Sequence, residues 1–263
     1  MDEKLMNKLI EEVSSKIASK GSEGGPGAGA KSFSARSITQ YVGRGEGDTI
    51  GLVIANVDSS LLESMNIGKD YRSLGIIGSR TGAGPQILAA DDAVKATNSE
   101  VVAVELARDT KGGAGHGCLI IFGASDVSDA KRAVEVSLES LDRYFGDVYG
   151  NSAGHIELQY TARASDAVHK AFTSKPGEAF GLVVGAPAAI GLLMADTAVK
   201  SANVNVIKYS SPKDAPYPNE GTLLISGDSE AVRQAVIAAR EVGKTLLETL
   251  GQEKALSTSK PYI

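Results

Sequence analysis

The chain has 263 residues, of which 42% are hydrophobic and 22% are charged, and its formal net charge is -5. These values are typical of a globular protein with room for two ordinary domains, and the acidic balance argues against general binding of nucleic acid. The single cysteine, Cys118, excludes a disulfide framework and favours a reducing compartment. We expect no membrane span, because no run of about 18 apolar residues occurs, and no secretory signal.

The chain begins with a predicted amphipathic helix over residues 2–17 and a glycine-rich flexible linker over residues 21–29. A short helix on such a tether is marginal alone in water, so its apolar stripe needs a partner. Either the helix folds back on its own domain, or it binds another protein, which the mobility of the tether favours. The stripe consists of Leu5, Met6, Leu9, Ile10, Val13 and Ile17.

The first domain is predicted to span residues 48–150, after an N-terminal region of residues 1–47. Hydrophobic periodicity predicts strands at 50–56, 74–78, 100–106 and 118–122 and helices at 59–65, 84–98 and 127–145. Asp126 or Ser125 can cap the last of these helices.

The second domain is predicted to span residues 151–263 with the same order of elements. We expect strands at 156–161, 180–185, 204–209 and 222–226 and helices at 165–172, 188–203 and 230–250. Asp228 or Ser229 can cap the last helix. Each domain therefore has the order β-α-β-α-β-β-α, which predicts an α+β fold with an antiparallel sheet and helices on one face.

The two domains are an internal repeat. Residues 90–98 return as residues 195–203, at an offset of 105. Upstream, residues 74–78 match 180–184, and downstream, residues 119–123 match 223–227. The offset is 106 upstream and 104 downstream, and these small changes place insertions in loops, where they are tolerated best. Such duplication is typical of a ring, a tile or a pore and unusual for an enzyme with a single site.

Two glycine-rich segments suggest an alternative function, the binding of phosphate. Residues 78–86 join a strand to a helix, the position of phosphate-binding loops, but they lack both the dinucleotide and the P-loop patterns. Residues 108–117 join two strands, so no helix dipole assists an anion there. These residues and their counterpart, residues 210–220, are either ordinary surface loops or loops that converge on a symmetry axis and line an opening.

The sequence contains no catalytic constellation. His116, His155 and His169 lack metal-ligand spacing, and no nucleophile with a partner base is indicated. Cys118 is better interpreted as a core residue. Asp91 and Asp196 are equivalent in the repeat, which favours a structural or interface role. We therefore expect no enzymatic activity, no cofactor and no bound metal.

Residues 194–204 and 223–232 resemble the shell domain of bacterial microcompartments, the BMC domain. In ordinary members of that family, the strand and helix that open each copy here come last. The chain thus resembles the tandem, circularly permuted shell proteins of this family. The resemblance covers nearly the whole chain, and the segment 109–117 is one of its more specific parts.

The resemblance implies a cyclic homotrimer whose six domains form a pseudohexameric tile in a microcompartment shell in the cytoplasm. The tile would contact other shell proteins in a compartment that uses propanediol or glycerol, which the sequence does not distinguish. The N-terminal helix would link encapsulated diol-pathway enzymes to the shell. Pores within each subunit would admit a small polyol, with Ser79, Arg80, Thr81 and Gln86 as candidate contacts. The candidate pore-loop residues are Arg108, Asp109, Lys111, Gly112, Gly113, His116, Lys213, Asp214 and Tyr217.

Two other functions remain open from the residues alone. One is a phosphate-binding protein or enzyme that uses the glycine-rich loops. The other is a ring-forming protein that binds a small ligand outside any shell. Flat arrays of the purified protein would favour a tile over a soluble sensor.

Overall fold

The structure is a computed structural model, and it describes residues 39–68, 70–106, 117–214 and 219–263. The predicted N-terminal helix, its apolar stripe and the glycine-rich linker lie outside the described residues. No helix in the described ranges has the length and apolarity that a membrane crossing requires.

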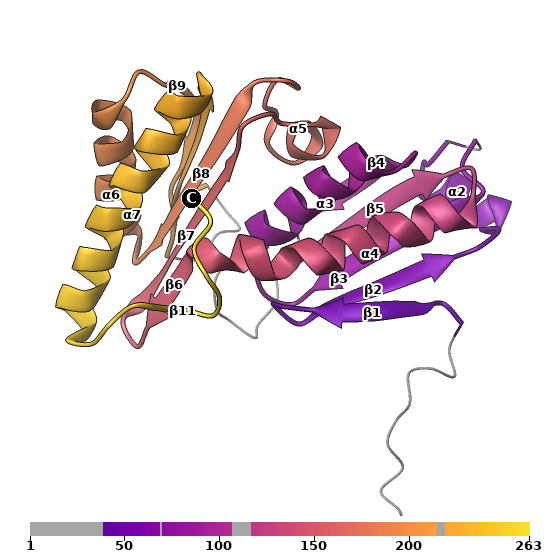
Figure 1. Cartoon of the computed structure of the whole chain (residues 1–263), viewed down its shortest axis with the longest axis horizontal. Coiled ribbons are helices and arrows are strands. Elements are labelled where there is room, and N and C mark those ends of the chain that lie inside the picture. The colour runs from indigo at the N-terminus through magenta and orange to yellow at the C-terminus, as the bar shows by residue number, and fades with distance from the viewer. Residues whose placement is uncertain (1–38, 69, 107–116, 215–218) are drawn as a thin grey trace, which may run out of the picture. The chain divides into compact units, whose positions relative to one another are not determined.

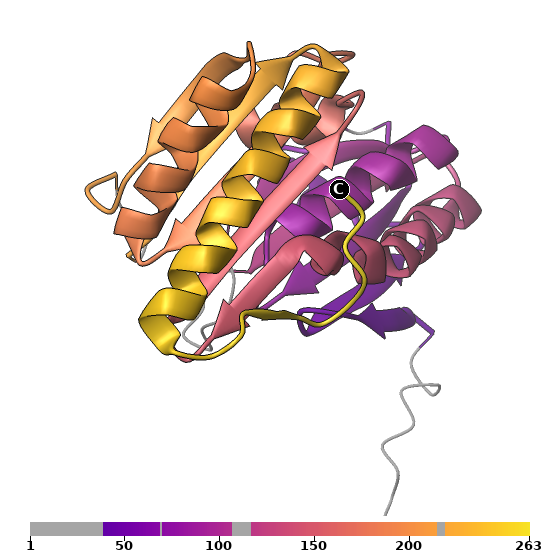
Figure 2. The same cartoon turned by 60° about the vertical axis from the view of Figure 1, so that its left-hand side comes forward.

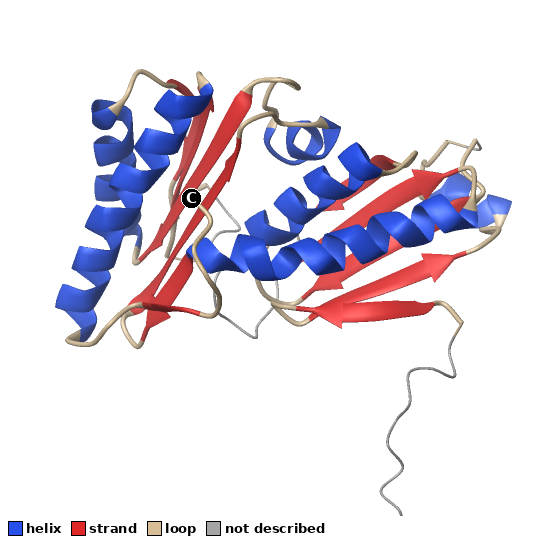
Figure 3. Ribbon diagram, in the orientation of Figure 1, coloured by secondary structure: helices blue, strands red, loops and turns tan. Residues whose placement is uncertain are grey.

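The first sheet has five antiparallel strands in the order β1-β2-β3-β5-β4 (Figures 1 and 3). Two long helices, α3 and α4, cover one face, while the short α2 packs its buried Leu62 with Leu74 and Ile121. The strands are β1 Tyr41–Gly45, β2 Thr49–Ile54, β3 Ser73–Ser79, β4 Glu100–Glu105 and β5 Cys118–Ala124. The helices are α2 Ser59–Ser64, α3 Gly84–Ala96 and α4 Val127–Tyr144.

The second sheet repeats this arrangement with six antiparallel strands in the order β11-β6-β7-β8-β10-β9. Figure 2 shows α6 and α7 side by side across it. The strands are β6 Val148–Asn151, β7 Gly154–Thr161, β8 Ala179–Ala186, β9 Asn205–Ser210, β10 Gly221–Gly227 and β11 Leu256–Ser257. The helices are α5 Asp166–Phe172, α6 Ala188–Ser201 and α7 Ser229–Gly251, and the 3₁₀ turn η2 covers Phe145–Asp147.

The long helices begin where the sequence provides caps. Asp126 accepts a hydrogen bond from the backbone N–H of Ser128 at 2.6 Å, and Asp228 accepts one from Glu230 at 3.0 Å. These bonds satisfy N–H groups that the first turn leaves without a partner. The cap positions predicted from the sequence are therefore confirmed at Asp126 and Asp228.

Matching glycines let α4 and α7 lie close to their sheets. A Cβ atom at Gly75 would lie 2.5 Å from the carbonyl oxygen of Ala130, and one at Gly181 would lie 2.9 Å from Val236. Real Cβ atoms do not approach so closely, so these strand positions require glycine. The same packing in both copies supports the prediction of a duplicated fold with helices on one face of each sheet.

Three strands, β1, β6 and the short β11, extend the fold beyond the predicted elements. β1 forms a hairpin with β2, and β6 forms an equivalent hairpin with β7. Gly47 and Asp48, in the first turn, have positive φ angles of 69° and 51°. Because β6 begins at Val148, the predicted boundary between residues 150 and 151 falls inside this strand.

The two domains share a buried surface. Helix α5 of the second domain packs against α3 and β4 of the first. Leu88 and Val101 of the first domain lie in one apolar cluster with Val168 and Leu182 of the second. The junction is therefore part of the hydrophobic core and positions the residues discussed below.

Candidate functional site

An open groove of about 1320 Å³ lies between the two equivalent hairpins. The β1–β2 hairpin contributes Arg44 and Asp48, and the β6–β7 hairpin contributes Asn151 and His155. Thr81 lies on its wall as well. The groove is larger than a three-carbon polyol needs, and its lining combines charged and polar groups that can orient hydroxyl groups.

The four predicted polyol contacts occupy different depths beside this groove. Thr81 lines the groove, and Arg80 is exposed. Gln86 is fully buried behind them, and its Nε2 donates to the Thr49 hydroxyl and to the Thr81 carbonyl, each at 3.0 Å. Ser79 accepts a hydrogen bond from the Cys118 backbone N–H at 3.1 Å. Thr81 and Arg80 are thus the members with access to a ligand.

Most of the predicted pore-loop residues lie outside the described residues, namely Arg108, Asp109, Lys111, Gly112, Gly113, His116 and Tyr217. The two that are described belong to the second loop: Lys213 is exposed, and Asp214 accepts a hydrogen bond from the Ser211 N–H at 2.8 Å. The first loop ends at Gly117, whose N–H donates to the Gly82 carbonyl at 2.7 Å. This bond holds its end beside the glycine-rich segment 78–86.

Sequence reasoning missed a buried acidic site next to the groove. His155 and Glu220 form a pair at 2.9 Å, and Glu220 is buried. Glu157, two residues along β7, is fully buried, and its Oε1 atom has no hydrogen-bond partner among the described residues. Burial raises the pKa of Glu157 to about 8, and the charge of Glu220 adds to the shift. The alternation of polar and apolar residues from 155 to 159 was the available signal.

This buried carboxyl group bears on the phosphate-binding alternative. The backbone N–H of Gly84, in the first turn of α3, donates a hydrogen bond to Glu157 and opposes the rise of its pKa. A Cβ at position 84 would clash with Glu157 Oε1 and would lie 2.7 Å from Leu182. The helix start that a phosphate would use is therefore filled by a side chain of the second domain.

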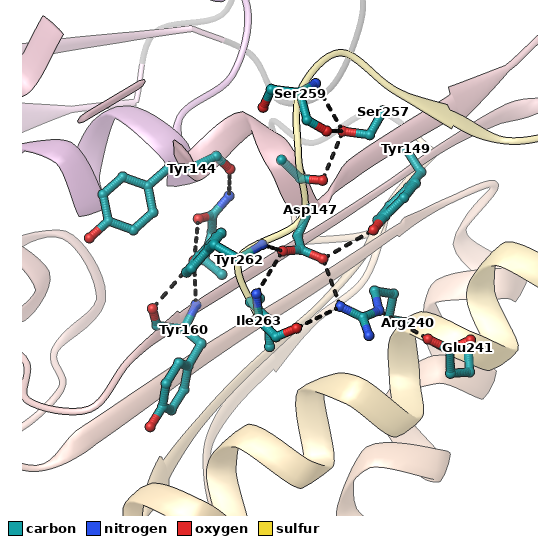
Figure 4. A network of polar contacts seen from close by, with 12 residues as sticks. Tyr144, Asp147, Tyr149, Tyr160, Arg240, Glu241, Ser257, Ser259, Tyr262 and Ile263 are labelled. Atoms are coloured by element: carbon teal, nitrogen blue, oxygen red, sulfur yellow. Dashed lines mark hydrogen bonds and ion pairs between the residues drawn. The ribbon is translucent and has the colours of Figure 1, made fainter. Parts of the chain in front are cut away.

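A second buried carboxyl group, Asp147, organises the C-terminal segment (Figure 4). It accepts hydrogen bonds from Arg240 Nη1 at 2.9 Å and from the Tyr149 hydroxyl at 3.1 Å. It also accepts bonds from the backbone N–H groups of Tyr262 and Ile263, at 2.8 Å and 3.0 Å. Because these partners come from three separate parts of the chain, this network is a structural lock.

The described residues offer little for catalysis or metal binding. Burial raises the pKa of the Cys118 thiol to about 11, so the thiolate needed of a nucleophile is scarce at neutral pH. Within the described ranges, no three histidine, cysteine or acidic side chains gather as metal ligands. The polar groove is the candidate binding site among the described residues, and it lies within a duplicated architecture.

Comparison with known proteins identifies that architecture. The BMC domain profile matches residues 73–153 and 179–254, one stretch in each copy. Over 218 residues the chain is 67% identical to the bacterial microcompartment shell protein PduB of Salmonella typhimurium, which covers 82% of this chain and 81% of that protein. Both profile matches begin where β3 and β8 begin, after the strand and helix that open each copy.

Two crystal structures share the fold along most of the chain. A trimeric bacterial microcompartment shell protein PduB has a TM-score of 0.82 and 51% identity, covering 86% of this chain and 100% of that chain. EtuB from Clostridium kluyveri has a TM-score of 0.82 and 52% identity, covering 86% of this chain and 99% of that chain. This chain therefore belongs to the BMC-domain family and is a shell protein of a bacterial microcompartment, with two circularly permuted copies of the domain.

Proposed function

We propose that three copies of this chain form a ring of six BMC domains, which acts as one non-catalytic tile of the shell. The strongest support is the relative described as trimeric, since it shares 51% identity and its whole length matches this chain. Two similar domains in one chain give a trimer the six-fold outline that a sheet of hexagonal tiles requires. Other shell proteins are the neighbours of such a tile.

The compartment that this tile encloses processes propanediol or glycerol, and the tile passes the polyol through pores. Support comes from the likeness to proteins named PduB and from the polar groove that Thr81 helps to line. A polar lining favours small hydroxylated molecules over apolar ones of similar size. In this proposal the two loops at residues 108–117 and 213–220 surround the central opening of the ring.

The N-terminal segment ties encapsulated enzymes to the inner face of the shell. The support is the apolar stripe from Leu5 to Ile17 on a glycine-rich tether. Without residues 1–30, shells should contain less of the diol-pathway enzymes, while the trimer itself persists. Unchanged enzyme content in such shells would contradict this role.

Light scattering of the purified protein, together with electron microscopy of concentrated samples, tests the tile. We expect a mass near three times 27.2 kDa and sheets with hexagonal spacing. A monomer or a dimer that forms no arrays would overturn the proposal and favour a ligand-binding protein outside a shell.

A further inference from the structure

Strand β7 turns polar side chains toward the first domain. Side chains alternate along a strand, and Ile156 and Leu158 point to the face that α7 covers, where they lie in the apolar cluster of the second domain. His155 and Glu157 therefore point to the opposite face, toward the first domain. There the carboxyl group of Glu157 meets the first turn of α3, since a Cβ atom at Gly84 would clash with its Oε1 atom.

The surroundings of Glu157 suit a neutral carboxyl group. The residues paired with it on the neighbouring strands are Val148 of β6 and Val184 of β8. Its Oε1 atom has no hydrogen-bond partner among the described residues, and the donor that reaches the side chain is the backbone N–H of Gly84. A buried carboxylate with so few donors costs free energy, so the protonated form is favoured in this packing.

The groups around Glu157 do not compensate a negative charge. The carboxyl group of Glu220 raises its pKa by like charge, and no cation of the described residues acts on that pKa. The other group that senses Glu157 is the thiol of Cys118, which is neutral at pH 7 because burial raises its pKa to about 11. The other titratable groups on this side of β7 pair elsewhere: His155 with Glu220, Asp91 with Lys95, Asp92 with Tyr144, and Asp147 with Arg240 and Tyr149.

The backbone that Glu157 touches continues into a wall of the groove. Thr81, three residues before Gly84, lines the groove. Its N–H donates to the Gly47 carbonyl at 3.4 Å, and its carbonyl accepts a hydrogen bond from Gln86 Nε2 at 3.0 Å. His155, two residues before Glu157 on β7, lines the groove as well. A movement at the contact between Glu157 and Gly84 therefore changes the spacing of two groove walls.

We propose that Glu157 is a pH-sensitive latch on this groove. While its carboxyl group is protonated, the start of α3 and the segment 78–86 stay packed against β7. When the group ionises, water must reach it, and the segment withdraws from β7 and widens the groove at Thr81. A local change of charge thus selects between two positions of one wall. The latch is a property of the groove itself and holds for any ligand that the groove admits.

The latch is closed most firmly at acidic pH. In the closed form the pKa of Glu157 is about 8, whereas in contact with water it returns to its ordinary value near 4.5. Opening therefore releases a proton, and it becomes easier as the pH rises from about 4.5 to about 8, by up to about tenfold per pH unit. Above about pH 8 the group is ionised in both forms, so opening no longer depends on pH.

Hydrogen exchange of the full chain, followed by mass spectrometry, tests the latch. Wild type and Glu157→Gln are compared at equal pH, from about pH 5 to about pH 9, so that the intrinsic pH dependence of amide exchange cancels. In peptides that cover residues 78–88 we expect exchange in wild type, relative to the variant, to rise by up to about tenfold per pH unit and to level off near pH 8. A ratio that stays the same at every pH would overturn the latch.

The first turn of α6 is the internal control. The Ile190 N–H donates to the Pro187 carbonyl at 2.8 Å, as the Ile87 N–H in α3 donates to the Ala83 carbonyl at 2.9 Å. Exchange in this turn, relative to Glu157→Gln, should not change with pH. An equal rise in both helices would show that the whole fold opens, and it too would overturn the latch.

A second variant tests the coupling between the two carboxyl groups. Glu220→Gln removes the like charge that raises the pKa of Glu157. Compared with the double variant that also carries Glu157→Gln, its exchange ratio over residues 78–88 should level off at a lower pH than in wild type. A plateau that begins at the same pH would contradict the part of Glu220 in the latch.

Discussion

Two buried carboxyl groups near the domain junction have opposite surroundings. Asp147 is fully buried and accepts four hydrogen bonds, one of them from Arg240 and two from backbone N–H groups. Glu157 is also buried, but one of its oxygens has no partner among the described residues, and Glu220 lies near it. The number of donors distinguishes a carboxylate that holds the fold together from one that costs stability when ionised.

Removing the well-partnered carboxylate should have the largest effect. In Asp147→Ala, Arg240 loses its buried acidic partner and keeps only the exposed Glu241, and two backbone N–H groups of the C-terminal segment lose their acceptor. We expect the free energy of unfolding to fall by roughly 3–5 kcal/mol, measured by urea denaturation. Glu241→Ala is the control, because Glu241 also pairs with Arg240 but its side chain is exposed. An equal loss in both variants would show that Asp147 has no special role.

This network also shows what the sequence could not predict. Asp147 and Arg240 are 93 residues apart, and no local pattern connects them. Hydrophobic periodicity predicted all six helices of the two domains, because that signal is local. Strands β1 and β6 were missed because they are short, contain glycine and form only as hairpins.

Which residues of β5 correspond to which residues of β10 could not be predicted from the sequence either. Sequence similarity alone matched Leu119 with Leu223. In the sheets, however, Ile77 pairs with Ile120, and Val183, the counterpart of Ile77, pairs with Leu223. The structural match is therefore Ile120 with Leu223. A shift of one residue moves a strand's side chains to the opposite face, so only the pairing between strands decides which residues correspond.

The sequence placed all four proposed polyol contacts in one segment, but only the folded structure separates exposed Arg80 from buried Gln86.

Neutralising the poorly partnered carboxyl group should have an effect that is small at acidic pH and grows as the pH rises. The pKa of Glu157 is about 8 in the folded protein against an ordinary value near 4.5. The folded state therefore retains a proton that the unfolded state has lost, and wild-type stability falls as pH rises from about 4.5 to about 8. The slope reaches up to about 1.4 kcal/mol per pH unit. Glu157→Gln lacks this loss, so its stability relative to wild type should increase with pH across that range.

Urea denaturation of both proteins at several pH values measures this difference. Above about pH 8 the difference should become constant, because both states of the wild type are then ionised. Glu178→Gln is the control, since that residue is over a third exposed at the protein surface. A difference between wild type and Glu157→Gln that stays the same at every pH would show that Glu157 has no raised pKa.

Changing the space beside Glu157 should have the smallest effect. In Gly84→Ala, the new methyl group would meet Glu157 Oε1 and lie 2.7 Å from Leu182, so these buried side chains or α3 must shift. Overpacking of this kind costs about 1–3 kcal/mol. Gly78→Ala is a matched control, because its nearest neighbour, Ile50, lies at an ordinary 3.8 Å. If thermal unfolding showed the same stability for both variants, close packing of α3 against β7 would be contradicted. A loss confined to Gly84→Ala would show that the carboxyl group of one domain is held against the helix of the other.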